Sequence, residues 1–285
     1  MKICRFKTEA GEIHLGAITD DAHVLDLAPA GIIDLTTVLE NSDPAALVRA
    51  AAGKKLPRRP LAGATLLAPV DRQEVWAAGV TYLRSKKARM EESDFSATAY
   101  DRVYAAPRPE IFFKSLGEKV SGPDDPVGIR RDARWNVPEP ELALVLNSRG
   151  AVVGCTIGND MSSRDIEGEN LLYLPQAKTY HRSCALGPCI VLGAAEADVR
   201  TWKISLAIQR AGRTEFSGET SPGQLKRSFE ELAGYLFRSQ VFPHGVVLLT
   251  GTGIVPADTF TLQAGDQIDI EISGVGRLSN RVEVV

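Results

Sequence analysis

The feature that most constrains this chain is a pair of apolar runs bounded by carboxylates. The first run begins with Glu139 and Glu141 and continues through residues 142–146, and the second run ends at Asp160. Between them, residues 147–150 (Asn-Ser-Arg-Gly) are turn formers, so the pattern predicts a β-hairpin. Side chains i and i+2 of a strand point to the same face, and the turn would bring position 139 opposite position 160. Three carboxylates are therefore expected at one end of the hairpin.

This convergence predicts a divalent-metal site. Three carboxylates cannot all stay ionised close together in a partly buried place unless a cation holds them. Ligation by oxygen alone suits a hard ion such as Mg²⁺, Mn²⁺ or Ca²⁺. The alternative is a solvated strand face, which is the commoner explanation of a Glu-x-Glu pair. Glu139 lies between two prolines and leads into a core-like run, however, and the matching position of Asp160 favours the metal.

Composition and charge limit the possible classes of function. The chain has 285 residues, of which 44% are hydrophobic and 24% charged, as is ordinary for a globular protein. Its formal net charge of −3 gives no reason to expect nucleic acid or an anionic membrane as a partner. No stretch approaches the roughly 20 apolar residues of a membrane span, and no secretory signal precedes the first strand. The four cysteines lack metal or redox spacing, so we expect buried thiols in a cytoplasmic protein.

The chain is expected to divide into a small N-terminal α/β domain, residues 1–70, and a larger domain, residues 71–285. The basic, proline-bearing segment 54–60 is the best candidate for a boundary. The elements expected in the first part are strands at 3–6 and 13–17 and helices at 34–40 and 44–52.

Beyond this boundary the sequence predicts many strands and few long helices. An expected strand over 75–80 leads into an expected helix over 83–93. Ser221 is expected to cap a second helix that extends to about Ser239. The remaining predicted strands are 204–208, 213–216, 246–253, 260–262, 268–272 and 280–284. This pattern favours an α+β, β-rich fold with a barrel or sandwich core.

Four ordered motifs resemble the fumarylacetoacetate hydrolase superfamily. They are Pro-Glu-Pro-Glu-Leu at 138–142, Gly-Asn-Asp-Met-Ser-Ser-Arg-Asp at 158–165, Ala-Lys at 177–178 and Thr-Gly-Thr-Gly at 250–253. The resemblance covers the chain from about residue 75 to its end. It implies a mixed β-roll after a small variable N-terminal domain, and a homodimer or homotetramer. It also assigns Mg²⁺ or Mn²⁺ to Glu139, Glu141 and Asp160.

One departure from the family pattern bears on the reaction. Hydrolase members carry a histidine and a glutamate after the first barrel strand, and this dyad activates the attacking water. The present chain has Ser85 and Ala88 at those positions, and neither replaces the dyad. Residues 108–114 and 164–178 are similar to the 2-keto-3-deoxy-sugar-acid dehydratase branch, which includes arabinonate- and xylonate-derived substrates. The resemblance thus implies a Mg²⁺-dependent dehydratase that forms 2-oxoglutarate semialdehyde through a metal-stabilised enolate.

Five further residues are expected near the reacting centre. The resemblance places Lys178 at the substrate, where it would act with a lowered pKa or stay charged and bind the carboxylate. Thr252, in a glycine-flanked turn, is expected to offer hydroxyl and backbone donors to the substrate carboxylate. Glu110, beside aromatic residues, is a candidate acid or base. Arg84 and Ser85 are expected to meet the hydroxyl end of the substrate.

Each of these assignments has a structural alternative. Thr252 would then form an ordinary tight turn, Glu110 would be a strand-edge glutamate, and Arg84 and Ser85 would begin a surface helix. Arg164 and Asp165 are expected to form a structural ion pair or to support Asp160 from behind, with direct contact to the substrate as the alternative. The alternative functions are an acylpyruvate-type hydrolase, an oxaloacetate decarboxylase on the same metal, or a binding protein for 2-oxo acids without turnover. In every case the partner is a small 2-oxo acid.

Overall fold

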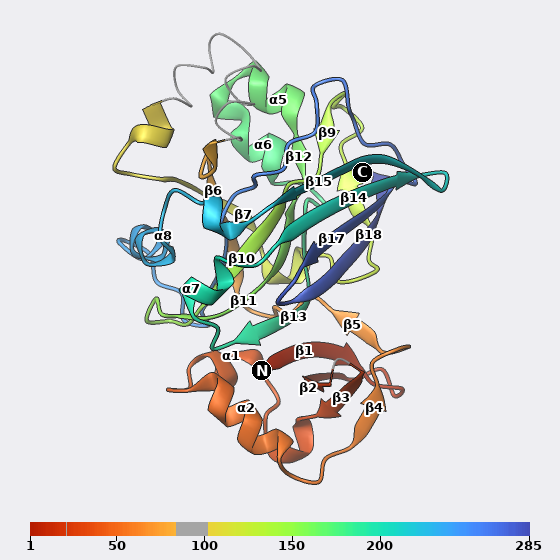
Figure 1. Cartoon of the computed structure of the whole chain (residues 1–285), viewed down its shortest axis with the longest axis vertical. Coiled ribbons are helices and arrows are strands. Elements are labelled where there is room, and N and C mark those ends of the chain that lie inside the picture. The colour runs from red at the N-terminus through yellow and green to blue at the C-terminus, as the bar shows by residue number, and fades with distance from the viewer. Residues whose placement is uncertain (21, 84–101) are drawn as a thin grey trace.

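The computed structural model describes residues 1–20, 22–83 and 102–285. Within them, strands form an 11-stranded mixed sheet, a 5-stranded sheet and a 2-stranded pair (Figure 1). The strands are β1 Lys2–Lys7, β2 Ile13–Thr19, β3 His23–Asp26, β4 Arg58–Pro60, β5 Thr65–Leu67, β6 Glu74–Gly79, β7 Glu110–Ser115, β8 Val127–Ile129, β9 Asn136–Val137, β10 Pro140–Leu146, β11 Val152–Asp160, β12 Ser162–Ser163, β13 Cys184–Leu192, β14 Ile204–Arg210, β15 Arg213–Thr220, β16 Val246–Leu249, β17 Gln267–Ile272 and β18 Gly276–Val284.

Helices are short and lie at the margins of these sheets. They are α1 Leu35–Leu39, α2 Pro44–Ala52, α5 Arg164–Glu169, α6 Leu174–Lys178, α7 Glu196–Val199 and α8 Phe229–Leu236, with 3₁₀ turns η1 Ala28–Ala30, η2 Gly117–Lys119, η3 Leu171–Tyr173 and η4 Pro222–Gln224. The order of the large sheet is β4-β3-β2-β1-β13-β11-β10-β16-β6-β7, with β5 as the eleventh strand paired to β1 off this path. The order of the second sheet is β15-β14-β17-β18-β8. The expected β-rich α+β fold is confirmed.

Strand β10 is apolar on both faces because both of its faces are covered. Leu142, Leu144 and Leu146 belong to one buried cluster with strands of the second sheet, whereas Ala143 and Val145 belong to a second cluster with α1 and α2. A strand buried on both sides needs a continuous apolar run, which explains the sequence of this segment. Alternation places positions 139 and 141 on the same face as the second cluster.

The N-terminal strands continue the sheet that carries the hairpin. β1 pairs antiparallel with β13 through Lys2–Val191 and Ile3–Ile190. Figure 1 shows this segment, with α1 and α2, at the end of the molecule opposite α5 and α6. Its apolar cluster also includes residues of β10, β13 and β16. The division near residue 70 stays a prediction.

Two expected elements differ in the structure. The helix expected from Ser221 is interrupted: Pro222–Gln224 form a 3₁₀ turn, Leu225 is extended and forms a bridge with Tyr82, and α8 begins only after Ser228. Ser221 caps the 3₁₀ turn, since its hydroxyl accepts a hydrogen bond from the Gly223 amide at 3.1 Å, and the Ser228 hydroxyl caps α8 by accepting one from the Glu231 amide. A bridge to a distant segment therefore outweighs local helical spacing.

The strand expected over 260–262 is absent: Phe260 donates to the Ala257 carbonyl and Leu262 to the Asn136 carbonyl, each at 2.9 Å, and the segment forms no ladder among the described residues. The helix expected over 83–93 lies almost wholly outside the described residues.

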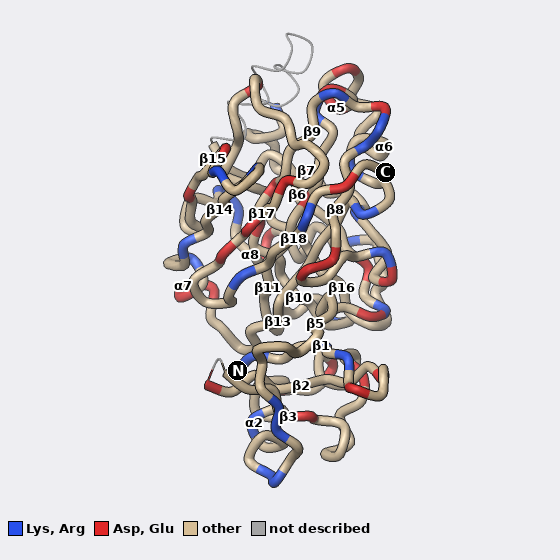
Figure 2. Tube along the Cα trace, turned by 90° about the vertical axis from the view of Figure 1, so that its right-hand side faces the viewer, with Lys and Arg blue, Asp and Glu red and all other residues tan. Residues whose placement is uncertain are grey.

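Basic and acidic residues are interspersed along the described chain (Figure 2), in keeping with the net charge of −3. Within the described residues, no helix is both long and apolar enough to cross a membrane. All four cysteines are buried and free, as expected from the sequence.

Candidate metal centre

The predicted hairpin is formed by β10 and β11. Glu141 pairs with Gly158 in the ladder, and beyond its end the Asp160 amide donates to the Glu139 carbonyl at 3.0 Å. The turn is closed by a hydrogen bond from Gly150 to Asn147 at 3.0 Å, with Gly150 at a φ of 78°, which glycine adopts without steric cost. The expected juxtaposition of positions 139 and 160 is confirmed.

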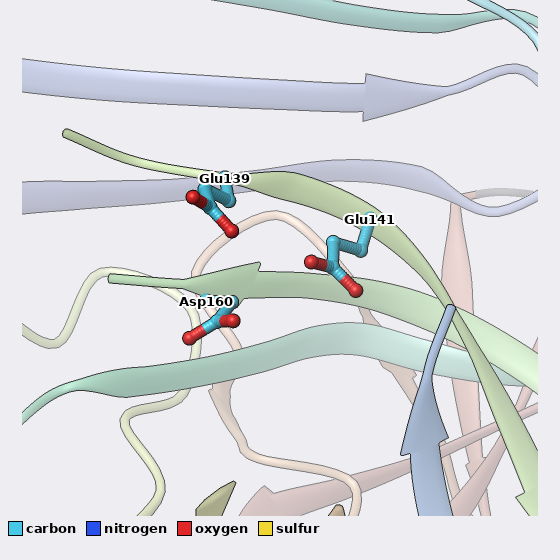
Figure 3. A group of neighbouring side chains, drawn as sticks. All are labelled: Glu139, Glu141 and Asp160. Atoms are coloured by element: carbon cyan, nitrogen blue, oxygen red, sulfur yellow. The ribbon is translucent and has the colours of Figure 1, made fainter. Parts of the chain in front are cut away.

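The three predicted carboxylates converge in the interior (Figure 3). Glu139, Glu141 and Asp160 are at most 4% exposed, and one oxygen from each lies within 4.8 Å of the others. Figure 3 shows Glu139 and Glu141 directed from the start of β10 toward the same space as Asp160 at the end of β11. Buried oxygens at this spacing fit a hard divalent ion.

The raised pKa of Glu141 indicates that a bound cation would stabilise the ionised form of this cluster. Burial raises the pKa of its carboxyl well above the usual value of 4.5, and the charges of Asp160 and Glu139 raise it further. Its Oε2 accepts a hydrogen bond from the Gly251 amide at 2.6 Å. Gly251 has a φ of 89°, and a Cβ there would lie 2.1 Å from the Thr81 hydroxyl oxygen, so the loop at this point needs glycine.

Lys178 lies at the centre of the predicted site. It is the last residue of α6 and is 2% exposed. Its Nζ donates to Glu139 Oε2 at 2.8 Å, to Asp160 Oδ2 at 2.9 Å and to the Ser162 hydroxyl at 2.6 Å. Three acceptors, two of them carboxylates, match the three protons of an ammonium group. Ser162 was not expected at the site.

Lys114 is a second buried lysine that the sequence analysis did not assign. It is 0% exposed on β7, forms an ion pair with Asp160 Oδ1 and donates to the carbonyls of Met161, at 3.0 Å, and Lys178. The available signal was a lone lysine within the apolar strand of residues 111–113, because a buried charge requires a partner.

Arg164 contacts a different ligand from the one expected. It is 2% exposed at the start of α5, and its guanidinium forms an ion pair with Glu139 Oε1 at 2.8 Å. The sequence predicts its place behind Asp160, whereas this ion pair lies on Glu139. Its neighbour Asp165 accepts a hydrogen bond from the Arg134 amide at 2.7 Å.

A cavity opens onto the carboxylates. Its lining residues are Ala78, Gly79, Val80, Glu110, Phe112, Glu139, Glu141, Asp160, Arg164, Glu167, Lys178, Gly251 and Thr252. Lys178, Glu110 and Thr252 therefore share one space with the triad. The Thr252 hydroxyl donates to the Ile254 carbonyl at 3.3 Å and accepts from its amide at 3.1 Å, so it stabilises its own loop as well.

Glu110 and Glu167 are two further carboxylates in the lining of this cavity. Glu110 opens β7 opposite Gly79 of β6, and a Cβ on Gly79 would lie 2.3 Å from the Glu110 carboxylate. Glu167 on α5, 4% exposed, was not expected at the site and had no clear sequence signal apart from its place three residues after Arg164. Arg84 and Ser85 lie outside the described residues.

The chain is similar to a known enzyme family and to two dehydratases of that type. The family model described as fumarylacetoacetate (FAA) hydrolase C-terminal matches residues 74–283. A probable 2-keto-3-deoxyxylonate dehydratase of Haloferax volcanii is 49% identical over 217 residues, which are 76% of this chain and 74% of that protein. A 2-dehydro-3-deoxy-D-arabinonate dehydratase of Saccharolobus solfataricus is 41% identical over 218 residues, or 75% and 73% of the two chains.

A solved structure is similar over the full length. The 2-keto-3-deoxy-D-arabinonate dehydratase complexed with magnesium and 2,5-dioxopentanoate superimposes with a TM-score of 0.83 at 33% identity, covering 100% of this chain and 99% of that one.

Proposed function

The chain belongs to the fumarylacetoacetate hydrolase family, and from this premise we propose that it is a Mg²⁺-dependent dehydratase of a 2-keto-3-deoxy-pentonate of the arabinonate or xylonate type. Loss of water gives 2-oxoglutarate semialdehyde, the same compound as 2,5-dioxopentanoate. The observation that carries this proposal is the full-length likeness to the dehydratase complexed with magnesium and that compound.

Glu139, Glu141 and Asp160 are the proposed ligands of Mg²⁺ or Mn²⁺, because their oxygens lie close enough to share one ion. An ion held there would bind the 2-oxo acid and withdraw charge from its 2-oxo group, which acidifies the C3 hydrogens. Lys178 and Arg164 hold Glu139 from two sides at 2.8 Å and keep its carboxylate oriented toward the cavity.

Dehydration needs a base at C3 and an acid at the C4 hydroxyl. Lys178 and Glu110 are the proposed catalytic residues, since both line the cavity beside the triad. Thr252 is proposed to offer donors to the substrate carboxylate. Arg84 and Ser85 remain proposed contacts of its hydroxyl end. The absence of the His/Glu dyad at Ser85 and Ala88 supports elimination over hydrolysis, because elimination needs no activated water.

Metal-dependent turnover of 2-keto-3-deoxy-D-arabinonate or -xylonate tests this function. A coupled NAD-dependent dehydrogenase would detect 2-oxoglutarate semialdehyde, with and without chelator. We expect product only with metal, and restoration when Mg²⁺ is returned. Consumption of acylpyruvate or oxaloacetate with no semialdehyde would overturn the proposal.

We further propose that the protein is cytoplasmic and works as a homodimer or homotetramer, as the resemblance implies. Sedimentation of the purified chain tests the assembly. The four buried free thiols support a reducing compartment.

A further inference from the structure

One of the three described acceptors of Lys178 is a neutral hydroxyl group. The Lys178 Nζ donates to Glu139 Oε2 at 2.8 Å, to Asp160 Oδ2 at 2.9 Å and to the Ser162 hydroxyl at 2.6 Å. Glu139 and Asp160 are proposed metal ligands, so an ion at the triad competes with the ammonium group for their negative charge. Ser162 is therefore the described acceptor of Lys178 that stands outside the proposed ligand set.

The hydrogen bond between Lys178 and Ser162 has a fixed direction. A serine hydroxyl has one proton and two lone pairs. The Ser162 hydroxyl donates this proton to the Asp160 carbonyl at 2.9 Å, so only its lone pairs remain for the lysine. The chain of donors thus runs from the Lys178 ammonium through the Ser162 hydroxyl to the main chain of β11.

Ser162 is held rigidly enough to fix a flexible side chain. It is 0% exposed, and in the pairing of β12 with β9 it lies opposite Val137. The lysine stem has several rotatable bonds, which lose entropy when the side chain is ordered. Lys178 lines the cavity, whereas the described lining does not include Ser162. The hydroxyl therefore acts on the cavity through the lysine.

Given the dehydratase function proposed above, we propose that Ser162 is a positioning residue for Lys178. Its hydroxyl fixes the Nζ at the cavity while the neighbouring carboxylates serve the metal, and it does not contact the substrate. A misplacement of about 1 Å in a reacting group can cost about 100-fold in rate. The effect belongs to kcat, because neither substrate binding nor metal ligation depends directly on this hydroxyl.

Ser162→Ala removes the acceptor. We expect kcat to fall at least about tenfold, with KM and the Mg²⁺ dissociation constant, measured by calorimetry, within about threefold of wild type. The matched control is Ser163→Ala, because the buried Ser163 hydroxyl next to it donates to Asn136 Oδ1 at 2.8 Å. Its kcat should stay within about twofold of wild type. Equal losses of kcat in the two variants would contradict the proposal.

A double-mutant cycle separates positioning from a general structural role. In a Lys178→Met background, Ser162→Ala has no ammonium group left to orient. The double variant should therefore have the kcat of Lys178→Met within about twofold. A further tenfold fall would mean that the hydroxyl acts by a route other than Lys178, and the proposal would be wrong.

The order of the ammonium group gives a readout that needs no turnover. In the Mg²⁺-loaded wild-type protein, ¹⁵N NMR should show Lys178 Nζ protons protected from exchange, identified by their loss in Lys178→Met. Ser162→Ala should abolish this protection. A wild-type protein without it would overturn the proposal, whether or not the variant folds. Failure of the proposed dehydration would look different: the wild type would form no semialdehyde, yet the protection and its dependence on Ser162 would remain.

Discussion

At the scale of single residues, the centre is a compact set of buried charges. Three cations, Lys114, Lys178 and Arg164, are each no more than 2% exposed, and each contacts a carboxylate of the triad. Removing one partner of a buried ion pair leaves the other without compensation, which costs more than the pair contributes. We therefore expect substitution of any of these three cations to lower the free energy of unfolding.

Lys178→Met removes the ammonium that contacts Glu139, Asp160 and Ser162. We expect turnover to fall by at least about 100-fold, the usual loss when a proton-transferring group is removed. Steady-state kinetics at saturating Mg²⁺, with metal content measured alongside, checks this. Activity near that of the wild type would show that Lys178 has no catalytic role.

Lys114→Met leaves Asp160 with one cation fewer and the carbonyls of Met161 and Lys178 without a donor. We expect the free energy of unfolding to fall by about 3–5 kcal/mol, measured by urea denaturation. Lys119→Met, at an exposed position a few residues later, is the control and should change stability by less than about 0.5 kcal/mol. Equal effects of the two changes would contradict a structural role for the buried ion pair.

At the scale of elements, strand pairing decides where the catalytic candidates lie. The β6–β7 ladder sets Gly79 opposite Glu110, and the β10–β11 ladder sets Glu141 opposite Gly158. In both cases a glycine faces a carboxylate of the cavity. At Gly79 the absent side chain leaves room for the Glu110 carboxylate, whereas at Gly158 it leaves room for the side chain of Leu249, which a Cβ would approach to 2.1 Å.

Gly79→Ala tests the first of these pairs. The added Cβ would lie 2.3 Å from Glu110 Oε2, so the carboxylate must move. We expect kcat to fall at least about tenfold while Mg²⁺ affinity, measured by calorimetry, stays unchanged, because displacing a positioned group weakens proton transfer. Unchanged kcat would mean that the position of Glu110 is irrelevant to the reaction.

Gly234→Ala is the matched change in another element. Position 234 is exposed in α8, and an added Cβ there meets nothing within 4 Å. Replacing a helical glycine with alanine should raise the free energy of unfolding by up to about 1 kcal/mol and leave kcat unchanged.

At the scale of the whole molecule, the metal centre makes the free energy of unfolding depend on pH. The raised pKa of Glu141 means that the metal-free folded protein holds a proton that the unfolded chain releases above about pH 4.5. The unfolded state then binds fewer protons than the folded state, so this group lowers stability as pH rises. This loss of stability is absent at pH values below the pKa of Glu141 in the unfolded chain. It grows as the pH rises, until the pH exceeds the pKa of Glu141 in the folded protein.

Glu141→Gln removes this titration. In the presence of chelator, we expect the variant to be more stable than the wild type at pH 8, with the difference shrinking toward pH 4. Urea denaturation at both pH values measures this. Excess Mg²⁺ should reverse the order at pH 8, because the wild type gains binding free energy that the variant lacks. A difference that grows toward low pH would contradict the pKa shift.

The hairpin and its three carboxylates could be predicted from the sequence alone. Glu139, Glu141 and Asp160 lie on one continuous segment, and the two-residue period of a strand together with a short turn fixes their relative positions. Local geometry over about 20 residues was sufficient, so their proximity followed without knowledge of the rest of the chain. The family motifs added Lys178, which lies in the same cavity.

The distant groups that complete the site could not be predicted in this way, because their positions depend on tertiary packing. Lys114 reaches Asp160 from β7, and Glu167 enters the cavity from α5, through packing that no local pattern encodes. The same reason explains the interrupted helix after Ser221, where a bridge between Leu225 and Tyr82 outweighs helical spacing. Contacts between residues far apart in sequence depend on how sheets and helices pack, and that packing is settled by the free energy of the whole fold.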